Sequence, residues 1–338
     1  MLNLQYPILL IKSTTKRSFE ALGRLIDRSG DTIARNLAEA AGSYRFMQEI
    51  SQKAFNNNKV IFVSIDDTLI KKMFSMFMEG SGYFFDSKLG RRIMAYRLMV
   101  GMATDGHYAF PIAGDFLFSK ELFKDAKKMK FNLFKKIVLL AYELYPDKKI
   151  IIVADGAFPT IETLTWLVQN NIRFEMRLAK NRVIDWKGKK IKVRDIKKLY
   201  PKGRQMSRTI QAQWHNLNVF ISAERRIDKH GEETFVYQIA NYEALPNEHV
   251  KTYKRRWPIE KFIRTSKQYL GLQECFSTKI ETQKNHVASV FLAYAIAQLE
   301  MKKRKLKTPE EAIRALKKKN VNLLLSRIPS QVEVFAMG

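Results

Sequence analysis

The sequence predicts an α/β fold with a β-rich insertion and helical segments at both ends. Two runs of β-branched and other apolar residues that end in acids predict buried strands, at 59–68 and 149–156. An apolar stripe at helical spacing predicts a helix over 131–145, which Pro146 ends. From 181 to 241 the pattern changes to short alternating segments separated by turn residues, which is typical of antiparallel strands.

Composition favours a folded protein with a polyanionic partner. The chain has 338 residues, of which 46% are hydrophobic, so it can bury a substantial core. Its 60 Lys and Arg against 33 Asp and Glu give a formal net charge of +27, which favours nucleic acid first and an anionic membrane surface second. No glycine-rich phosphate loop is present, which argues against an NTP-driven enzyme.

Targeting and metal-binding signals are sparse. The apolar runs at 60–65 and 287–299 are too short to span a bilayer, and the patch at 9–11 lacks a signal-peptide cleavage site, so no membrane partner is expected. The single cysteine, Cys275, excludes an internal disulfide and a Cys-based zinc cluster, and it fits a small buried residue in a reducing cytoplasm. His286 is expected to be a packing residue. The other histidines lack metal-ligand spacing and are expected at the surface or in turns: His107, His215, His230 and His249.

The N-terminal region, residues 1–58, is predicted to be helical. A helix over 18–26 with a Ser18 cap is followed by a turn at 28–30 and a basic helix over 32–37. Asp31 or Ser29 could cap that second helix. Helix, glycine turn and basic helix resemble a DNA-binding helix-turn-helix, although many helical hairpins with this pattern bind no DNA.

The remaining elements follow in order along the chain. Two strands at 98–104 and 108–117 flank a hairpin turn at Asp105-Gly106. A helix is expected at 160–169 and a strand at 172–178. The strands of the β-rich segment are expected at 189–193, 209–213, 217–224 and 234–239, and the chain from 247 onward is predicted to be mostly helical.

One charged run contains a lone carboxylate at the start of a predicted helix. Pro258 suits the first turn, and Glu260 and Lys267, seven positions apart, share one helix face. Tyr253 and Arg256 come just before that face. A carboxylate that can hold a metal, flanked by groups that can hold phosphate, fits chemistry on a nucleic-acid backbone. The alternative is a solvated helix face of mixed charge.

Two further acids are placed to meet Glu260. Asp67 ends the first predicted strand and Asp155 ends the fourth, and acids at strand ends point into the ligand crevice of an α/β sheet. Their oxygens suit Mg²⁺, and two such ions can drive an in-line displacement at phosphorus. Each strand-end acid could instead belong to a plain turn, and Asp66 competes with Asp67 for the role. Three strands, a helix, a strand and a helix, with acids on the first and fourth strands, describe the ribonuclease-H-like fold.

The charged run also carries a resemblance to a known family. Tyr253, Arg256, Glu260 and Lys267 match, at all four positions and with the same spacing, the Tyr-Arg-Glu-Lys signature of a group of bacterial insertion-sequence transposases. The chain therefore resembles the hairpin-forming, cut-and-paste DDE transposases over roughly residues 59–300. In that family the first catalytic Asp precedes a Thr, which selects Asp67, and Asp155 corresponds to the second.

The resemblance implies a site and its cofactors. Two divalent ions, Mg²⁺ or Mn²⁺, would be held by the three acids Asp67, Asp155 and Glu260. Phosphates of the transposon end would be bound by Tyr253, Arg256 and Lys267. Similar enzymes stack a flipped base on a Trp of the β-rich insertion, for which Trp186 and Trp214 are candidates, with a sheet-face role as the alternative. DNA contact and a solvated loop stay open for Arg177, Lys180, Asn181 and Arg182.

The resemblance also implies a function and a division into domains. The protein would cleave transposon ends and join them to target DNA in the bacterial cytoplasm, at the nucleoid, as a homodimer that pairs two double-stranded ends. A ribonuclease-H-like nuclease and a catalytically inactive DNA-binding regulator are the alternatives. The expected domains are an N-terminal DNA-binding region at 1–58, a catalytic domain at 59–300 with its insertion at 181–241, and a basic helical tail at 301–338.

Overall fold

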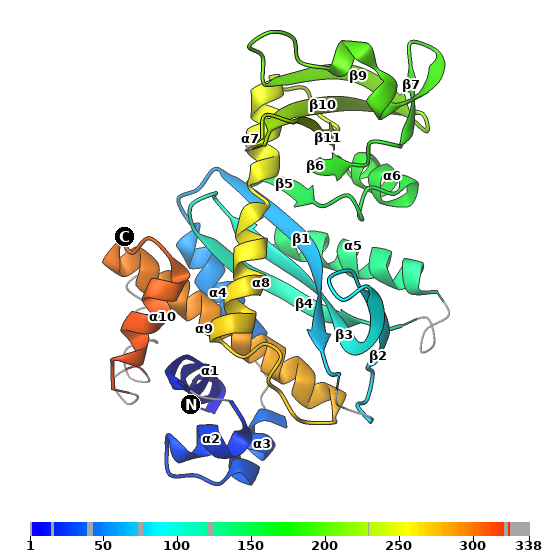
Figure 1. Cartoon of the computed structure of the whole chain (residues 1–338). Coiled ribbons are helices and arrows are strands. Elements are labelled where there is room, and N and C mark those ends of the chain that lie inside the picture. Colours follow the sequence, from blue (N-terminus) through cyan, green and yellow to red (C-terminus); the bar gives the residue numbers. More distant parts are fainter. Residues whose placement is uncertain are drawn as a thin grey trace. The chain divides into compact units, whose positions relative to one another are not determined.

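The chain folds into two compact units (Figure 1). The computed structural model describes residues 2–14, 17–38, 43–73, 77–119, 125–228, 230–320 and 324. The first unit comprises Met1–Asn58, Asp67–Pro146 and Ile259–Gly338, and the second comprises Lys59–Asp66 and Asp147–Pro258. The predicted three-part division stays a prediction. The tail was expected at 301–338, and beyond residue 320 only residue 324 of it belongs to the described residues.

The first unit contains an antiparallel group of strands. Strand β3 (Arg91–Thr104) pairs with β2 (Gly82–Asp86) and β4 (Ala109–Leu117), and it lies next to β1 (Val60–Lys71) in the strand order. The predicted turn between β3 and β4 is confirmed, because the Asp105 carboxylate accepts the backbone N–H groups of residues 107 and 108 at 2.7 and 2.8 Å. Strand β2 was not predicted, because its exposed face carries aromatic side chains that hide the usual alternation.

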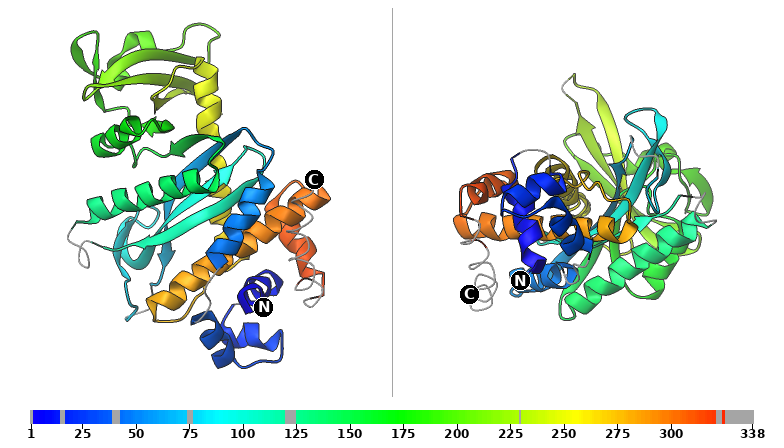
Figure 2. Two further views of the ribbon diagram at one scale, coloured as in Figure 1. Left: turned by 180° about the vertical axis from the view of Figure 1, so that it is seen from behind. Right: turned by 90° about the horizontal axis from the view of Figure 1, so that it is seen from below.

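Helices cover both faces of these strands. Helix α5 (Ala126–Leu144) lies along one face and α8 (Trp257–Tyr269) crosses the other, as the front and back views show (Figures 1 and 2). Helix α5 begins five residues before its predicted start at 131, with the Asp125 side chain accepting the Lys128 N–H at 3.0 Å. Its buried residues begin only at Phe134, so the apolar stripe does not reveal the first two turns.

Helix α9 (Ile280–Arg304) forms the core of the first unit. It is buried along most of its length and packs on β4, α1 (Leu2–Lys12), α4 (Ser43–Ala54) and α10 (Pro309–Lys317). The Phe262 ring of α8 meets the ring of Phe291 on α9 edge to face, with 5.0 Å between centroids. Within the described ranges, no helix is both long enough and apolar enough to cross a membrane.

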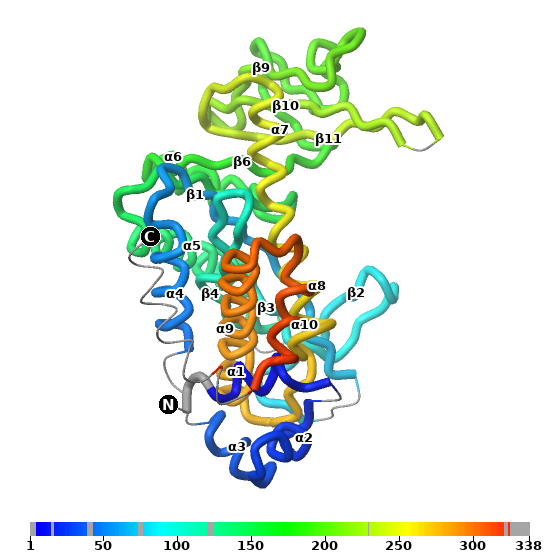
Figure 3. Tube along the Cα trace, turned by 90° about the vertical axis from the view of Figure 1, so that its left-hand side faces the viewer, coloured from blue at the N-terminus to red at the C-terminus, as the bar shows by residue number. Residues whose placement is uncertain are grey.

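The two helices predicted near the N-terminus are confirmed as α2 (Phe19–Arg24) and α3 (Gly30–Ala38), seen at the bottom of Figure 3. The Ser18 hydroxyl caps the first by accepting the Ala21 N–H at 3.2 Å. Ser29 rather than Asp31 caps the second, accepting the Thr32 N–H at 3.3 Å. The structure leaves the predicted DNA contact of these helices as a prediction.

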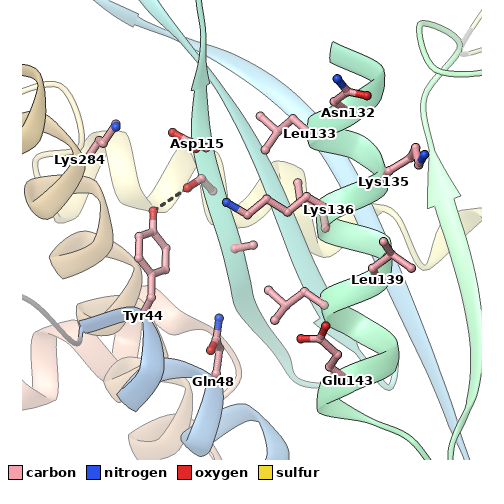
Figure 4. Close-up of a pocket in the computed structure, with 14 residues that line it drawn as sticks. Tyr44, Gln48, Asp115, Asn132, Leu133, Lys135, Lys136, Leu139, Glu143 and Lys284 are labelled. Atoms are coloured by element: carbon pink, nitrogen blue, oxygen red, sulfur yellow. Dashed lines mark hydrogen bonds between the residues drawn. The ribbon is translucent and has the colours of Figure 1, made fainter. Parts of the chain in front are cut away.

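Helix α4 protects the outer edge of β4. The Tyr44 hydroxyl donates to the Gly114 carbonyl at 2.8 Å (Figure 4), and the Gln48 amide donates to the Ile112 carbonyl at 3.0 Å. These bonds satisfy carbonyl groups that an edge strand would otherwise leave open. A cavity of about 660 Å³ lies between α4, β4 and α5, and no predicted site residue lines it.

The second unit holds a mixed sheet. Strand β1 pairs in parallel with β5 (Lys149–Ala154), which pairs in parallel with β6 (Arg173–Leu178), and α6 (Ile161–Gln169) connects β5 to β6. Strand β11 (Glu233–Ala240) pairs antiparallel with β6. The sheet continues in the order β11, β10 (Leu217–Ile227), β9 (Ser207–Trp214), β7 (Val183–Trp186) and β8 (Lys189–Lys192).

The β-rich segment therefore differs from its expected form. Its four predicted strands are present as β8 to β11, whereas β7 was not predicted. The expected antiparallel insertion is not confirmed as a subdomain of its own, since β11 pairs with β6 and joins these strands to the parallel ones. The mixed sheet with flanking helices agrees with the α/β class and is compatible with a ribonuclease-H-like fold.

The structure confirms the prediction for one histidine and contradicts the prediction for another. His286 is fully buried on α9 and accepts or donates hydrogen bonds on both ring nitrogens, so its predicted packing role is confirmed. His249, expected at the surface, is fully buried on α7 (Pro246–Lys254), because its ring is hydrogen-bonded to Glu175 of β6. Cys275 is a free, buried thiol, as predicted.

Candidate functional site

The neighbouring acids Asp66 and Asp67 have different partners. Successive side chains of a strand point to opposite faces, so these two carboxylates face apart. Asp66 accepts a hydrogen bond from the Arg256 guanidinium at 2.9 Å. Asp67 accepts one from the Lys130 ammonium of α5 at 3.0 Å, with the Arg97 guanidinium of β3 at 3.7 Å. Sequence reasoning missed Lys130 and Arg97, because no motif links them to Asp67.

Asp155 continues the same face of the second unit's sheet as Asp66. The β1–β5 register pairs Ser64 with Val153, and the residues two further along each strand are Asp66 and Asp155. The Asp155 carboxylate also accepts the Ala157 N–H at 2.9 Å, so this acid shapes the turn as well. The second unit therefore carries two carboxylates at the ends of neighbouring parallel strands.

Tyr253 and Arg256 lie beside these two acids. Tyr253 on α7 is buried and packs on Val153 of β5. Burial raises the pKa of the Tyr253 hydroxyl, while the Arg256 guanidinium lowers it and the nearby Asp155 charge raises it further. The Arg256 guanidinium also lies 5.7 Å from the centre of the Tyr253 ring. Within the second unit, Tyr253, Arg256, Asp66 and Asp155 thus form one cluster.

Glu260 and Lys267 belong to the first unit, on the helix face that the sequence predicted. Both line a cavity of about 650 Å³ that Asp67 also borders. The Lys267 ammonium donates to the Thr68 hydroxyl at 2.7 Å and to the Leu69 carbonyl at 2.8 Å. Burial, together with the charges of two nearby lysines, lowers the pKa of Lys267 to about 8. This ammonium is therefore a cation poised to lose its charge slightly above neutral pH.

A family assignment follows from comparison with known proteins. Residues 61–296 match the family model described as a transposase DDE domain. The chain is a member of this transposase family. No curated protein matches the chain. The matched region, which is more than half of the chain, contains Asp66, Asp67, Asp155, Glu260 and the phosphate-binding candidates.

Transposases of this family act on DNA and generally use divalent metal ions, and the acids of this transposase suit such ions. Carboxylate oxygens are the donors that Mg²⁺ and Mn²⁺ prefer. Asp66, Asp67, Asp155 and Glu260 are all partly exposed, so a hydrated ion can reach them. In the part of the chain that the structure describes, no cluster of three or more His, Cys, Asp or Glu side chains forms a ready metal site.

A second basic cavity of the transposase borders Asp155. It encloses about 680 Å³ and is lined by Arg177, Lys180 and Arg194 among others. Two of these cations were candidates from sequence, whereas Arg194 follows β8 and carries no sequence signal. The third candidate cation, Arg182, instead lies with its guanidinium 5.6 Å from the centre of the buried Trp214 ring.

Proposed function

We propose that this transposase excises a bacterial insertion sequence by a cut-and-paste route with hairpin ends, and that it belongs to the Tyr-Arg-Glu-Lys group. The observation that carries the proposal is the cluster of Tyr253 and Arg256 with Asp66 and Asp155 on one sheet face. Groups that hold phosphate then lie beside groups that hold metal, which is what processing of a DNA end requires.

For the metal ligands we propose Asp155, Glu260 and one of the two adjacent acids. The family resemblance selected Asp67. The shared sheet face with Asp155 and the bond to Arg256 favour Asp66 instead, because Asp67 faces the side covered by α5. When bound, two Mg²⁺ or Mn²⁺ ions would supply positive charge to the attacking and leaving oxygens.

The chain's other residues bind and orient the DNA in this proposal. Arg256 offers a two-pronged guanidinium to a phosphate, Lys267 a point charge and Tyr253 a hydroxyl donor. Water first cleaves one strand, and the freed 3′ hydroxyl attacks the opposite strand, closing a hairpin and releasing the flanking DNA. Water reopens the hairpin, and the 3′ hydroxyl then attacks target DNA. Each step replaces the leaving 3′ oxygen at a phosphorus with the oxygen of water or of an attacking 3′ hydroxyl, and a homodimer would pair two ends.

Cleavage of the element's own ends tests this function. DNA that carries the sequences flanking the gene would be incubated with the protein and Mg²⁺, and the products separated on a denaturing gel. We expect nicks, then hairpins, then joined products, none of which should form with Asp155→Asn. Nicks without hairpins would identify a nuclease, and binding without any cleavage would identify a regulator, so either result would overturn the proposal.

The lowered pKa of Lys267 predicts a pH dependence of DNA-end binding. Its ammonium is charged below pH about 8 and loses its charge as the pH rises through that value. We expect affinity for end DNA at fixed salt to fall about tenfold between pH ~7 and ~9, since one charge-assisted bond is lost. In Lys267→Arg the guanidinium stays charged, so the affinity should remain nearly constant. Fluorescence anisotropy would measure both, and an equal decline in the two proteins would contradict the role of Lys267.

A further inference from the structure

The β2–β3 hairpin of the first unit exposes large aromatic side chains. Tyr83 and Phe85 are 52% and 58% exposed, whereas Phe84 between them is buried in a small core with Ile93 and packs near Leu69. Figure 3 shows the hairpin standing out from the rest of the first unit. Two neighbouring rings on the outer face of a strand are an unusual exposure for residues of this size.

The tip of this hairpin is held firmly. The Asp86 carboxylate accepts the backbone N–H groups of Lys88 and Leu89, at 2.8 and 3.2 Å. The same carboxylate pairs with the Lys71 ammonium of β1 at 2.5 Å. The turn is therefore fixed from within and tied to the adjoining strand, which holds the backbone next to Phe85 in place. A preordered surface loses little entropy when it binds a partner.

The hairpin also forms a wall of the cavity that contains Glu260 and Lys267. Phe85, Ser87 and Lys88 line that cavity of about 650 Å³. Tyr83 occupies the same face of β2 but is not among the lining residues. One exposed ring is thus placed at the cavity, and its neighbour two positions away provides a natural comparison.

The charge around Phe85 indicates what partner the ring would meet. Arg92 is its cross-strand neighbour, and Lys88 and Arg91 are exposed at the tip. An apolar protein segment would gain nothing from three cations, whereas a nucleic-acid strand offers phosphates for the cations and base faces for the ring. Bases within an intact duplex are already stacked on one another, so an unpaired strand fits the ring best.

We propose that the β2–β3 hairpin binds single-stranded DNA entering the cavity, with Phe85 stacking on an unpaired base and Lys88 binding an adjacent phosphate. The inference rests on the proposed function, in which two residues of this cavity take part: Glu260 as a metal ligand and Lys267 as a phosphate-binding group. It adds binding of unpaired nucleotides by the hairpin to the proposed phosphate contacts of Arg256 and Lys267.

Binding of a short single strand tests the assignment. A mixed-sequence oligonucleotide of about 16 nucleotides and its duplex would be titrated with wild type, Phe85→Ala, Phe85→Trp and Tyr83→Ala without metal. We expect Phe85→Ala to weaken single-strand binding roughly 5- to 100-fold, because stacking on an aromatic ring contributes that much per base. Phe85→Trp should retain binding, and duplex affinity and Tyr83→Ala should change less than about twofold.

Several outcomes would overturn the assignment. Unchanged single-strand binding by Phe85→Ala would remove Phe85 from the contact. An equal loss in Tyr83→Ala would mean that the strand runs along the outer face of β2 and does not enter the cavity, because Tyr83 does not line it. An equal loss for the duplex would show a general charge effect. Thermal melting of each variant checks its folding. If the wild type cuts no end DNA but Phe85-dependent binding persists, the proposed function fails and the binding site stands. If the wild type cuts end DNA but its single-strand binding does not depend on Phe85, the proposed function stands and the binding site fails.

Discussion

Asp66→Asn should lower metal-dependent nicking of end DNA by on the order of 10³-fold, whereas Asp67→Asn should lower it about 10- to 100-fold. Loss of a metal ligand removes several kcal/mol of charge stabilisation, and each ~1.4 kcal/mol is tenfold in rate. A residue that only supports the site from outside typically costs about 10- to 100-fold. The two variants differ by one position and make the same chemical change, so each is the other's control.

The physical basis of this ranking is the direction of the two side chains. Asp66 lies on the sheet face shared with Asp155, and its Arg256 partner also contacts Tyr253. Asp67 is held by Lys130 and Arg97 on the other face. A metal ion at Asp66 would replace one guanidinium, which could then turn to a phosphate. A metal ion at Asp67 would have to displace two cations that have no such second role.

Single-turnover nicking across a range of Mg²⁺ concentrations would measure both effects. End-DNA affinity without metal should stay within a few-fold of wild type in both variants, which separates catalysis from binding. Glu260→Gln sets the scale, because it removes a proposed ligand that has no competing neighbour. If Asp67→Asn proves the more damaging variant, Asp67 is the ligand, as the family resemblance implied.

The adjacent acids also show where sequence reasoning reaches its limit. A strand that ends in two acids predicts a carboxylate at a sheet edge, and the spacing of Glu260 and Lys267 predicts a shared helix face. The choice between Asp66 and Asp67 depends on which face each helix covers, and that is set by packing between residues far apart in sequence. A shift of one residue along a strand reverses its face, so no local pattern can make this choice.

Other parts of the fold could not be predicted from the sequence for similar reasons. The β2 strand lacks polar alternation because Tyr83 and Phe85 are exposed, and the first turns of α5 lack buried residues. His249 was expected at the surface, because its partner Glu175 lies 74 positions earlier in the chain. Local spacing identifies the elements with apolar stripes, whereas pairing between distant polar side chains becomes visible only in three dimensions.

The buried Glu175–His249 pair should make the stability of the second unit depend on pH. The two side chains are 1% and 0% exposed, with Glu175 Oε2 and His249 Nδ1 2.6 Å apart, and the Tyr242 hydroxyl donates to the same oxygen at 3.1 Å. Burial raises the pKa of Glu175 from 4.5 to about 7, although the hydrogen bonds from His249 and Tyr242 oppose the rise. A carboxyl group with no contact to water resists ionisation in this way.

The sign of the effect follows from proton binding. Below pH 4.5 Glu175 is protonated in both the folded and the unfolded chain, so its stabilising contribution is complete. Between pH 4.5 and about 7 the unfolded chain releases this proton while the folded chain keeps it. The free energy of unfolding should therefore fall as the pH rises through this window, by up to about 3 kcal/mol. Glu175→Gln cannot ionise, so its stability should lack this decline.

Urea unfolding followed by tryptophan fluorescence would measure the difference. All four tryptophans of the chain, Trp166, Trp186, Trp214 and Trp257, lie in the second unit, so the signal reports the unit that contains the pair. The comparison uses the change from pH ~4.5 to ~7 within each protein, which cancels the cost of the substitution itself. Parallel pH profiles for wild type and Glu175→Gln would mean that Glu175 is ionised in the fold. In that case His249→Gln should destabilise the unit most at neutral pH, because it removes the hydrogen-bond partner of a buried charge.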